Sequence, residues 1–132
     1  MRILVCEGNM KTAKSYPFWE QLYPLLEHHE VKKIEGILSE PEIIELLNWC
    51  DVWVSIDSFL QHLVAWKGIK RGVVLWGISN PDMFGYPNNV NLLKDRKYLR
   101  PDQFIWWKDE KLNPDAFVDP KMVVLAIESV VQ

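Results

Sequence analysis

Residues 52–76, VWVSIDSFLQHLVAWKGIKRGVVLW, decide the fold class of this chain. Two short apolar runs, rich in β-branched residues, flank a stretch of helical periodicity. The pattern predicts a buried strand over 52–56, a helix over 58–67 and a second buried strand over 72–76. A strand, a helix and a strand in this order are typical of a βαβ unit in a parallel sheet.

The same alternation continues on both sides of this unit. The other predicted elements are strands at 3–6 and 31–34 and helices at 15–29, 39–50 and 117–131. Strands separated by helices in this way favour a mainly parallel sheet with helices on both faces. The sequence therefore predicts one Rossmann-like α/β domain spanning residues 1–132.

Several helix boundaries can be predicted from single residues. Ser39 and Glu42 form a capping box for the helix that follows them. Ser15 is expected to open the first helix and Asp119 the last. Pro24 is expected to kink the first helix or end it early, because an interior proline removes a backbone donor.

Composition and charge limit the classes of partner. The 132 residues are 48% hydrophobic and 25% charged, which is typical of a globular domain. The net charge is -3 and the lysines and arginines are scattered, so no nucleic acid partner is expected. No apolar run is long enough for a signal sequence or a membrane span, and we expect a cytoplasmic protein without a membrane partner.

The cysteines give no sign of a metal site. Cys6 and Cys50 each lie in an apolar segment without a second cysteine or a histidine at metal-ligand spacing. Two buried free thiols are predicted, and a disulfide between them is the alternative. Adjacent pairs of histidines or acidic residues elsewhere are interpreted as exposed charge, so neither a metal nor a cofactor is predicted.

Polar side chains gather where the strand over 52–56 meets the next helix. Asp57 and Ser58 follow the strand, and His62 lies one turn into the helix. In open parallel sheets, ligands bind beyond the carboxyl ends of the strands, where helix amides can hold phosphate. The alternative is that Asp57 only caps the helix and that His62 is a half-buried structural residue; chemistry alone favours this alternative.

Two linked motifs point to a known family. The run from Asp57 to His62 is followed by an apolar strand and by GISNP, residues 77–81. This order resembles the carboxyl-terminal half of the heptosyltransferase-like glycosyltransferases of family 9, with their Asp, Ser/Thr and His, apolar strand and Gly-x-Thr/Ser-x-Pro loop. The segment KTAKSYPFWEQLYPLL resembles the family's Lys-aromatic-Pro segment, and Lys14 is the matching lysine. The likeness covers about the whole chain.

The resemblance implies the nucleotide-binding half of a GT-B enzyme, which in this family holds the ADP part of an ADP-sugar. It implies that Lys14, Ser58 and the helix amides hold phosphate, and that Asp57 and His62 bond to phosphate or ribose. Residues of the GISNP loop and its continuation are expected at the rim, although their prolines and glycine serve equally to turn the chain. The predicted ligand-binding residues are Lys14, Asp57, Ser58, Phe59, His62, Ser79, Asn80 and Phe84.

The chain departs from the family in three respects. Phe59 replaces the usual glycine, so the anion pocket is expected to be narrower or differently angled. A helix and a strand that usually precede the helix at 39–50 are missing. The sequence also lacks the amino-terminal half, which supplies the acceptor site and the catalytic base in GT-B enzymes.

These departures separate three hypotheses. The expected function is a stand-alone binding protein that captures an adenine nucleotide or another nucleotide diphosphate, sequesters or senses it, and transfers nothing. The alternative is a glycosyltransferase that is completed by a partner chain or by self-association, with Asp57 and His62 as the nearest titratable pair. A scaffold that has lost its ligand is the third hypothesis, since fold does not imply function.

Large apolar residues cluster near the carboxyl-terminal end. The segment PDQFIWWKDE, residues 101–110, predicts an edge strand at 104–107 that packs on the last helix. The alternative is that some of these side chains face a second subunit, and a homodimer is predicted on this basis.

Overall fold

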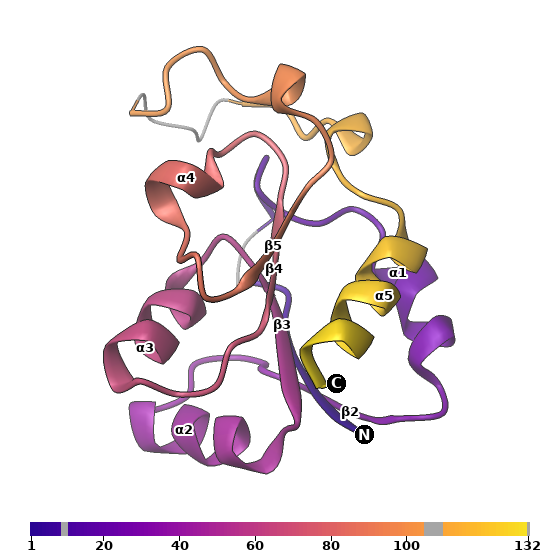
Figure 1. Ribbon diagram of the computed structural model, residues 1–132, viewed down its shortest axis with the longest axis vertical. Helices are drawn as coiled ribbons and strands as arrows, with labels where there is room; N and C mark the ends of the chain where they lie inside the picture. Colours follow the sequence, from indigo (N-terminus) through magenta and orange to yellow (C-terminus); the bar gives the residue numbers. More distant parts are fainter. Residues whose placement is uncertain (9–10, 105–109, 132) are drawn as a thin grey trace.

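Strands and helices alternate along the chain (Figure 1). The computed structural model describes residues 1–8, 11–104 and 110–131. The strands are β1 (Arg2–Cys6), β2 (Glu30–Lys33), β3 (Val52–Ile56), β4 (Val73–Trp76) and β5 (Val90–Leu93). The α-helices are α1 (Trp19–Leu22), α2 (Glu40–Trp49), α3 (Phe59–Lys67), α4 (Pro81–Phe84) and α5 (Pro120–Val131). Short 3₁₀ helices are η1 (Tyr23–Leu26), η2 (Arg96–Tyr98) and η3 (Pro114–Ala116).

The five strands form one sheet with the order β2-β1-β3-β4-β5, and every neighbouring pair is parallel. The central strands β3 and β4 are buried along their whole length, as continuous apolar runs in a parallel sheet should be. The chain is therefore an α/β protein with a Rossmann-like parallel sheet, which confirms the fold class predicted from the sequence.

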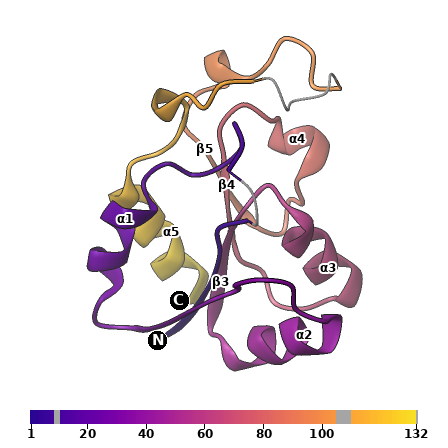
Figure 2. The same ribbon diagram turned by 180° about the vertical axis from the view of Figure 1, so that it is seen from behind.

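Helices cover both faces of the sheet, as Figures 1 and 2 show from opposite sides. On one face, α1, η1 and α5 pack over a core that includes Val5, Leu75 and Phe117. On the other face, α2 and α3 pack over a core that includes Trp53 and Trp76. Burial of these two apolar layers is the main force that holds the helices against the sheet.

Pro24 shortens the first helix, as predicted. α1 ends at Leu22, and the chain continues as η1, which contains Pro24. The predicted start at Ser15 is wrong, because α1 begins at Trp19. The Ser15 hydroxyl instead accepts a hydrogen bond from the Thr12 amide at 2.9 Å and closes a turn before the helix.

The caps predicted for the later helices are confirmed in two cases and wrong in one. Ser39 and Glu42 form the predicted capping box of α2. The carboxylate of Asp119 accepts a hydrogen bond from the first turn of α5, also as predicted. The expectation that Asp57 caps α3 is wrong: Ser58 is the N-cap residue, and Asp57 has other partners.

The edge of the sheet differs from the sequence prediction. β5 was not predicted; it follows a loop rich in turn-forming residues and consists of only four residues, VNLL. At the predicted edge strand 104–107, Phe104 lies in a turn, and residues 105–107 lie outside the described part of the chain.

Two further predictions concern buried thiols and membrane spans. Cys6 and Cys50 are both buried and not bonded to each other, so the prediction of free thiols is confirmed. Among the helices of the described residues, none combines the length and the apolar character that crossing a membrane requires.

Candidate functional site

The candidate site lies at the carboxyl ends of β1 and β3. These two strands are neighbours in the sheet, and Cys6 pairs with Ser55 near their ends. After β1 the chain leaves towards α1 on one face, whereas after β3 it leaves towards α3 on the other (Figures 1 and 2). Connections that diverge in this way open a crevice at the switch point of a parallel sheet, where ligands of such folds bind.

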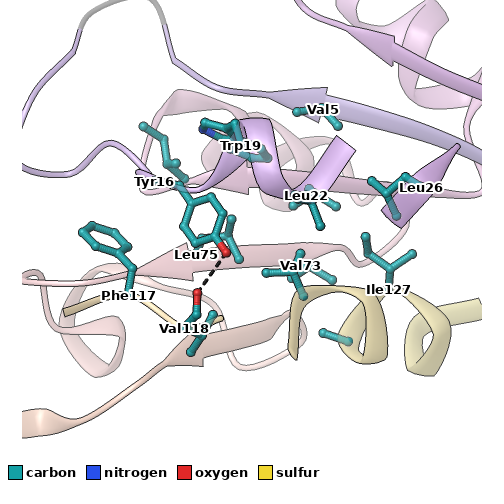
Figure 3. Close-up of a cluster of buried hydrophobic side chains, with 14 of the residues drawn as sticks. Val5, Tyr16, Trp19, Leu22, Leu26, Val73, Leu75, Phe117, Val118 and Ile127 are labelled. Atoms are coloured by element: carbon teal, nitrogen blue, oxygen red, sulfur yellow. Dashed lines mark hydrogen bonds between the residues drawn. The ribbon is translucent and has the colours of Figure 1, made fainter. Parts of the chain in front are cut away.

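A local turn places Lys14 next to Asp57, which follows β3. The Lys14 amide donates a hydrogen bond to Thr12 Oγ1 at 3.1 Å, which fixes the backbone before the lysine. The flanking residues Ala13 and Tyr16 are both buried. Tyr16 packs against Trp19, and its hydroxyl donates a hydrogen bond to the Val118 carbonyl at 2.9 Å (Figure 3). The turn that carries Lys14 is therefore anchored in the core.

The carboxylate of Asp57 links the connection after β1 to the first turns of α3. Its Oδ2 lies 3.1 Å from the Lys14 ammonium, and its Oδ1 accepts a hydrogen bond from Gln61 Nε2 at 2.9 Å. The Asp57 side chain is 9% exposed and that of Lys14 is 23% exposed. The carboxylate is thus nearly enclosed, and it holds the partly exposed ammonium of Lys14 beside the start of α3.

The first turn of α3 faces the same crevice. The Ser58 hydroxyl does not cap this turn; it lies 3.2 Å from the hydroxyl of Ser55. The first amides of a helix have no acceptor within the helix, and together with the helix dipole they favour an anion. α3 spans Phe59–Lys67, which is long enough for this effect.

Cavities surround the end of β1. Three of them, of about 200, 570 and 440 Å³, share Gly8 as part of their wall. The smallest lies beside the start of α3 and includes Cys6, Ile37, Ser58 and Phe59 in its lining. Gly8 has a φ of 90°, in the left-handed region that favours glycine.

Two ionisable residues, Cys6 and Glu7, lie at the end of β1 and interact with neighbouring groups. Burial raises the pKa of the Cys6 thiol, and hydrogen bonds from Gly8 and nearby serines offset this only in part. The thiol is therefore protonated at neutral pH and is no nucleophile there. Glu7 accepts a hydrogen bond from the Tyr23 hydroxyl and lies 3.3 Å from Lys33 Nζ.

His62 and Phe84 have partners on the side of α4. His62 Nδ1 lies 2.7 Å from the Tyr86 hydroxyl, and the two rings meet edge to face. Phe84 is half-buried and packs edge to face on Phe104, with ring centres 6.0 Å apart. The predicted contacts of His62 and Phe84 with a ligand stay predictions.

Ser79 and Asn80 follow β4, the strand next to β3, and both are buried. The side-chain oxygen of Asn80 accepts a hydrogen bond from the Asp82 amide at 3.0 Å and caps α4. The backbone N–H of Asn80 donates a hydrogen bond to Gln103 Oε1 at 2.8 Å. These contacts give Asn80 a structural role, and its predicted place at the rim of the ligand site is untested.

Sequence reasoning missed two contributors to this geometry. Gln61 is fully buried and bonds to Asp57, four residues earlier, a spacing that brings side chains together on a helix. This i, i+4 relation was available in the sequence. Gly8 forms part of three cavities, and a glycine directly after an apolar strand was the signal that pointed to it.

Comparison of the chain with known protein families, with curated proteins and with solved structures finds no match. The likeness to the glycosyltransferases of family 9 therefore stays a prediction from the sequence motifs.

Proposed function

We propose that this chain binds a nucleotide diphosphate, such as ADP or an ADP-linked sugar, at the carboxyl ends of β1 and β3. The chain holds its ligand without transferring any group. Phosphate binding is the part of the proposal that the geometry supports, and the adenine and sugar follow the resemblance to family 9.

The observation that carries the proposal is the ion pair of Lys14 and Asp57 beyond the carboxyl ends of β1 and β3. Asp57 holds the ammonium next to the uncapped first turn of α3. A phosphate in this crevice meets a positive charge and backbone amides together, the two kinds of donor that bind phosphate best. Because Asp57 is itself negative, we expect the phosphate to contact Lys14 and the amides of α3.

The cavity beside α3 suits the organic part of such a ligand. It has a volume of about 200 Å³ and shares Ser58 and Phe59 with the phosphate site. Phe59 is 48% exposed, and its ring offers a flat surface on which a base can stack. The bulky residue that replaces the glycine of family 9 thus becomes a contact in this proposal.

Calorimetry against a panel of ligands tests the proposal. The panel contains ADP, ADP-ribose and an ADP-hexose, together with adenosine, which lacks phosphate, and inorganic pyrophosphate, which lacks the base. We expect the ADP compounds to bind and adenosine to bind much more weakly, because it cannot use Lys14. If no member of the panel binds to folded protein, the proposal is wrong.

The variant Lys14→Ala localises the site. Removal of one charge-assisted contact should weaken binding of ADP by about 1 to 3 kcal/mol, which is roughly 5- to 150-fold. The matched control is Lys67→Ala at the other end of α3, because Lys67 also has a carboxylate partner, Glu40, at 3.0 Å. Equal binding by both variants would place the ligand elsewhere.

Recovery of the ligand separates binding from transfer. After incubation of the chain with an ADP-hexose and denaturation, mass spectrometry should return the compound unchanged. Release of ADP together with a transferred or hydrolysed sugar would contradict a pure binding function and favour the glycosyltransferase hypothesis.

A further inference from the structure

α5 buries one side against the sheet and carries large apolar side chains among the polar residues of its outer side. Val123, Ala126 and Ile127 are buried against the sheet. On the opposite side, Met122 is 48% exposed and Leu125 is 58% exposed. A surface helix is normally polar on its outer face, so Met122 and Leu125 are candidates for a contact with another molecule.

Two opposite charges flank Leu125 on this outer side. Lys121 lies four residues before Leu125 and Glu128 lies three residues after it, so both project from the same side of the helix. Within the described part of the chain, neither side chain forms an ion pair. At 1.5 Å per residue, the two charges stand about 6 Å and about 4.5 Å from Leu125 along the axis, on opposite sides of it.

This spacing is self-complementary. A second α5 that runs antiparallel, related by a two-fold axis at Leu125, brings Lys121 of each copy opposite Glu128 of the other. The two Leu125 side chains then meet at the centre, and Met122 packs near Ser129 of the second copy. Closed two-fold contacts of this kind are the commonest form of self-association.

We propose that the exposed face of α5 binds a second copy of this chain as an antiparallel helix pair. The contact is a single helix of 12 residues, smaller than the surface that stable dimers bury. The dimer is therefore weak and reversible. The candidate ligand site lies at the carboxyl ends of β1 and β3, so the contact does not depend on the proposed nucleotide binding.

Sedimentation equilibrium at low salt tests the contact. The wild-type chain should shift from monomer to dimer over a concentration range from about 1 to about 300 µM. Leu125→Glu places a carboxylate at the two-fold axis, where it meets its own copy, and should weaken dimerisation by at least about 10-fold. Trp66→Glu is the matched control on α3, since Trp66 is 74% exposed, and it should dimerise like the wild type. A wild-type chain that stays monomeric throughout overturns the proposal.

Charge exchange tests the antiparallel geometry. Lys121→Glu and Glu128→Lys each place like charges opposite one another and should each reduce dimerisation by about 10-fold. A mixture of the two variants should form heterodimers, and the double variant should dimerise like the wild type, because both arrangements restore opposite charges. If the single exchanges leave dimerisation unchanged, or the double variant fails to recover it while its thermal unfolding matches that of the wild type, the antiparallel pair is wrong.

Discussion

At the scale of single residues, Gly72 shows how tightly β3 and β4 are packed. A Cβ atom at this position would lie 2.2 Å from two ring atoms of Trp53, which is fully buried. The indole cannot move aside without losing its hydrogen bond to the Lys70 carbonyl at 2.8 Å. Gly72→Ala should therefore destabilise the protein by roughly 2 to 3 kcal/mol, as overpacking of a core does, and urea unfolding measures it.

Gly36→Ala is the control for this substitution. Gly36 has a φ of 69°, and a Cβ atom there would meet nothing within 4 Å, so the cost is conformational only, about 1 to 2 kcal/mol. A Gly72→Ala variant as stable as the wild type would show that Trp53 can repack, contrary to this account.

At the scale of elements, the start of α2 depends on its capping box. Hydrogen bonds from Ser39 lower the pKa of Glu42, and the Ser39 hydroxyl accepts a hydrogen bond from the Glu42 amide. Ser39→Ala should cost about 1 kcal/mol in the free energy of unfolding at neutral pH. Asn48→Ala, an exposed change in the same helix, should cost nothing, because alanine is the better helix former.

The same cap predicts a dependence on pH. The pKa of Glu42 is lowered in the folded state, so its contribution is present above the ordinary pKa of a glutamate and is lost as the pH falls through the lowered value. The difference in stability between the wild type and Ser39→Ala should therefore shrink in acid. A difference that stays constant down to about pH 2 would show that Glu42 contributes nothing to the cap.

Elements with strong local signals were predictable, and those set by tertiary contacts were not. The capping box of α2 and the apolar runs of β3 and β4 specify their structure locally. β5 is different: its VNLL run is short, and it becomes a strand because it pairs with β4. α1 begins later than predicted: Tyr16 packs into the core before the helix starts at Trp19, which periodicity alone does not reveal.

At the scale of the whole molecule, the strand order creates the candidate site. β3 follows β2 in sequence but pairs with β1, and this brings Asp57 to Lys14. The sequence pointed to both residues, one from its position after a strand and both from the resemblance to family 9. Their ion pair required the fold, since no local pattern sets which strands are neighbours.

We propose that a nucleotide phosphate binds beyond the carboxyl ends of β1 and β3. Backbone amide NMR of the labelled protein, titrated with ADP, tests it most directly because each amide reports its own surroundings. We expect the largest shifts at Gly8 and in the first turn of α3, from Ser58 to Gln61, with little change at Gly68 at the far end of that helix. Shifts confined to another surface, or none at millimolar ADP, would contradict it.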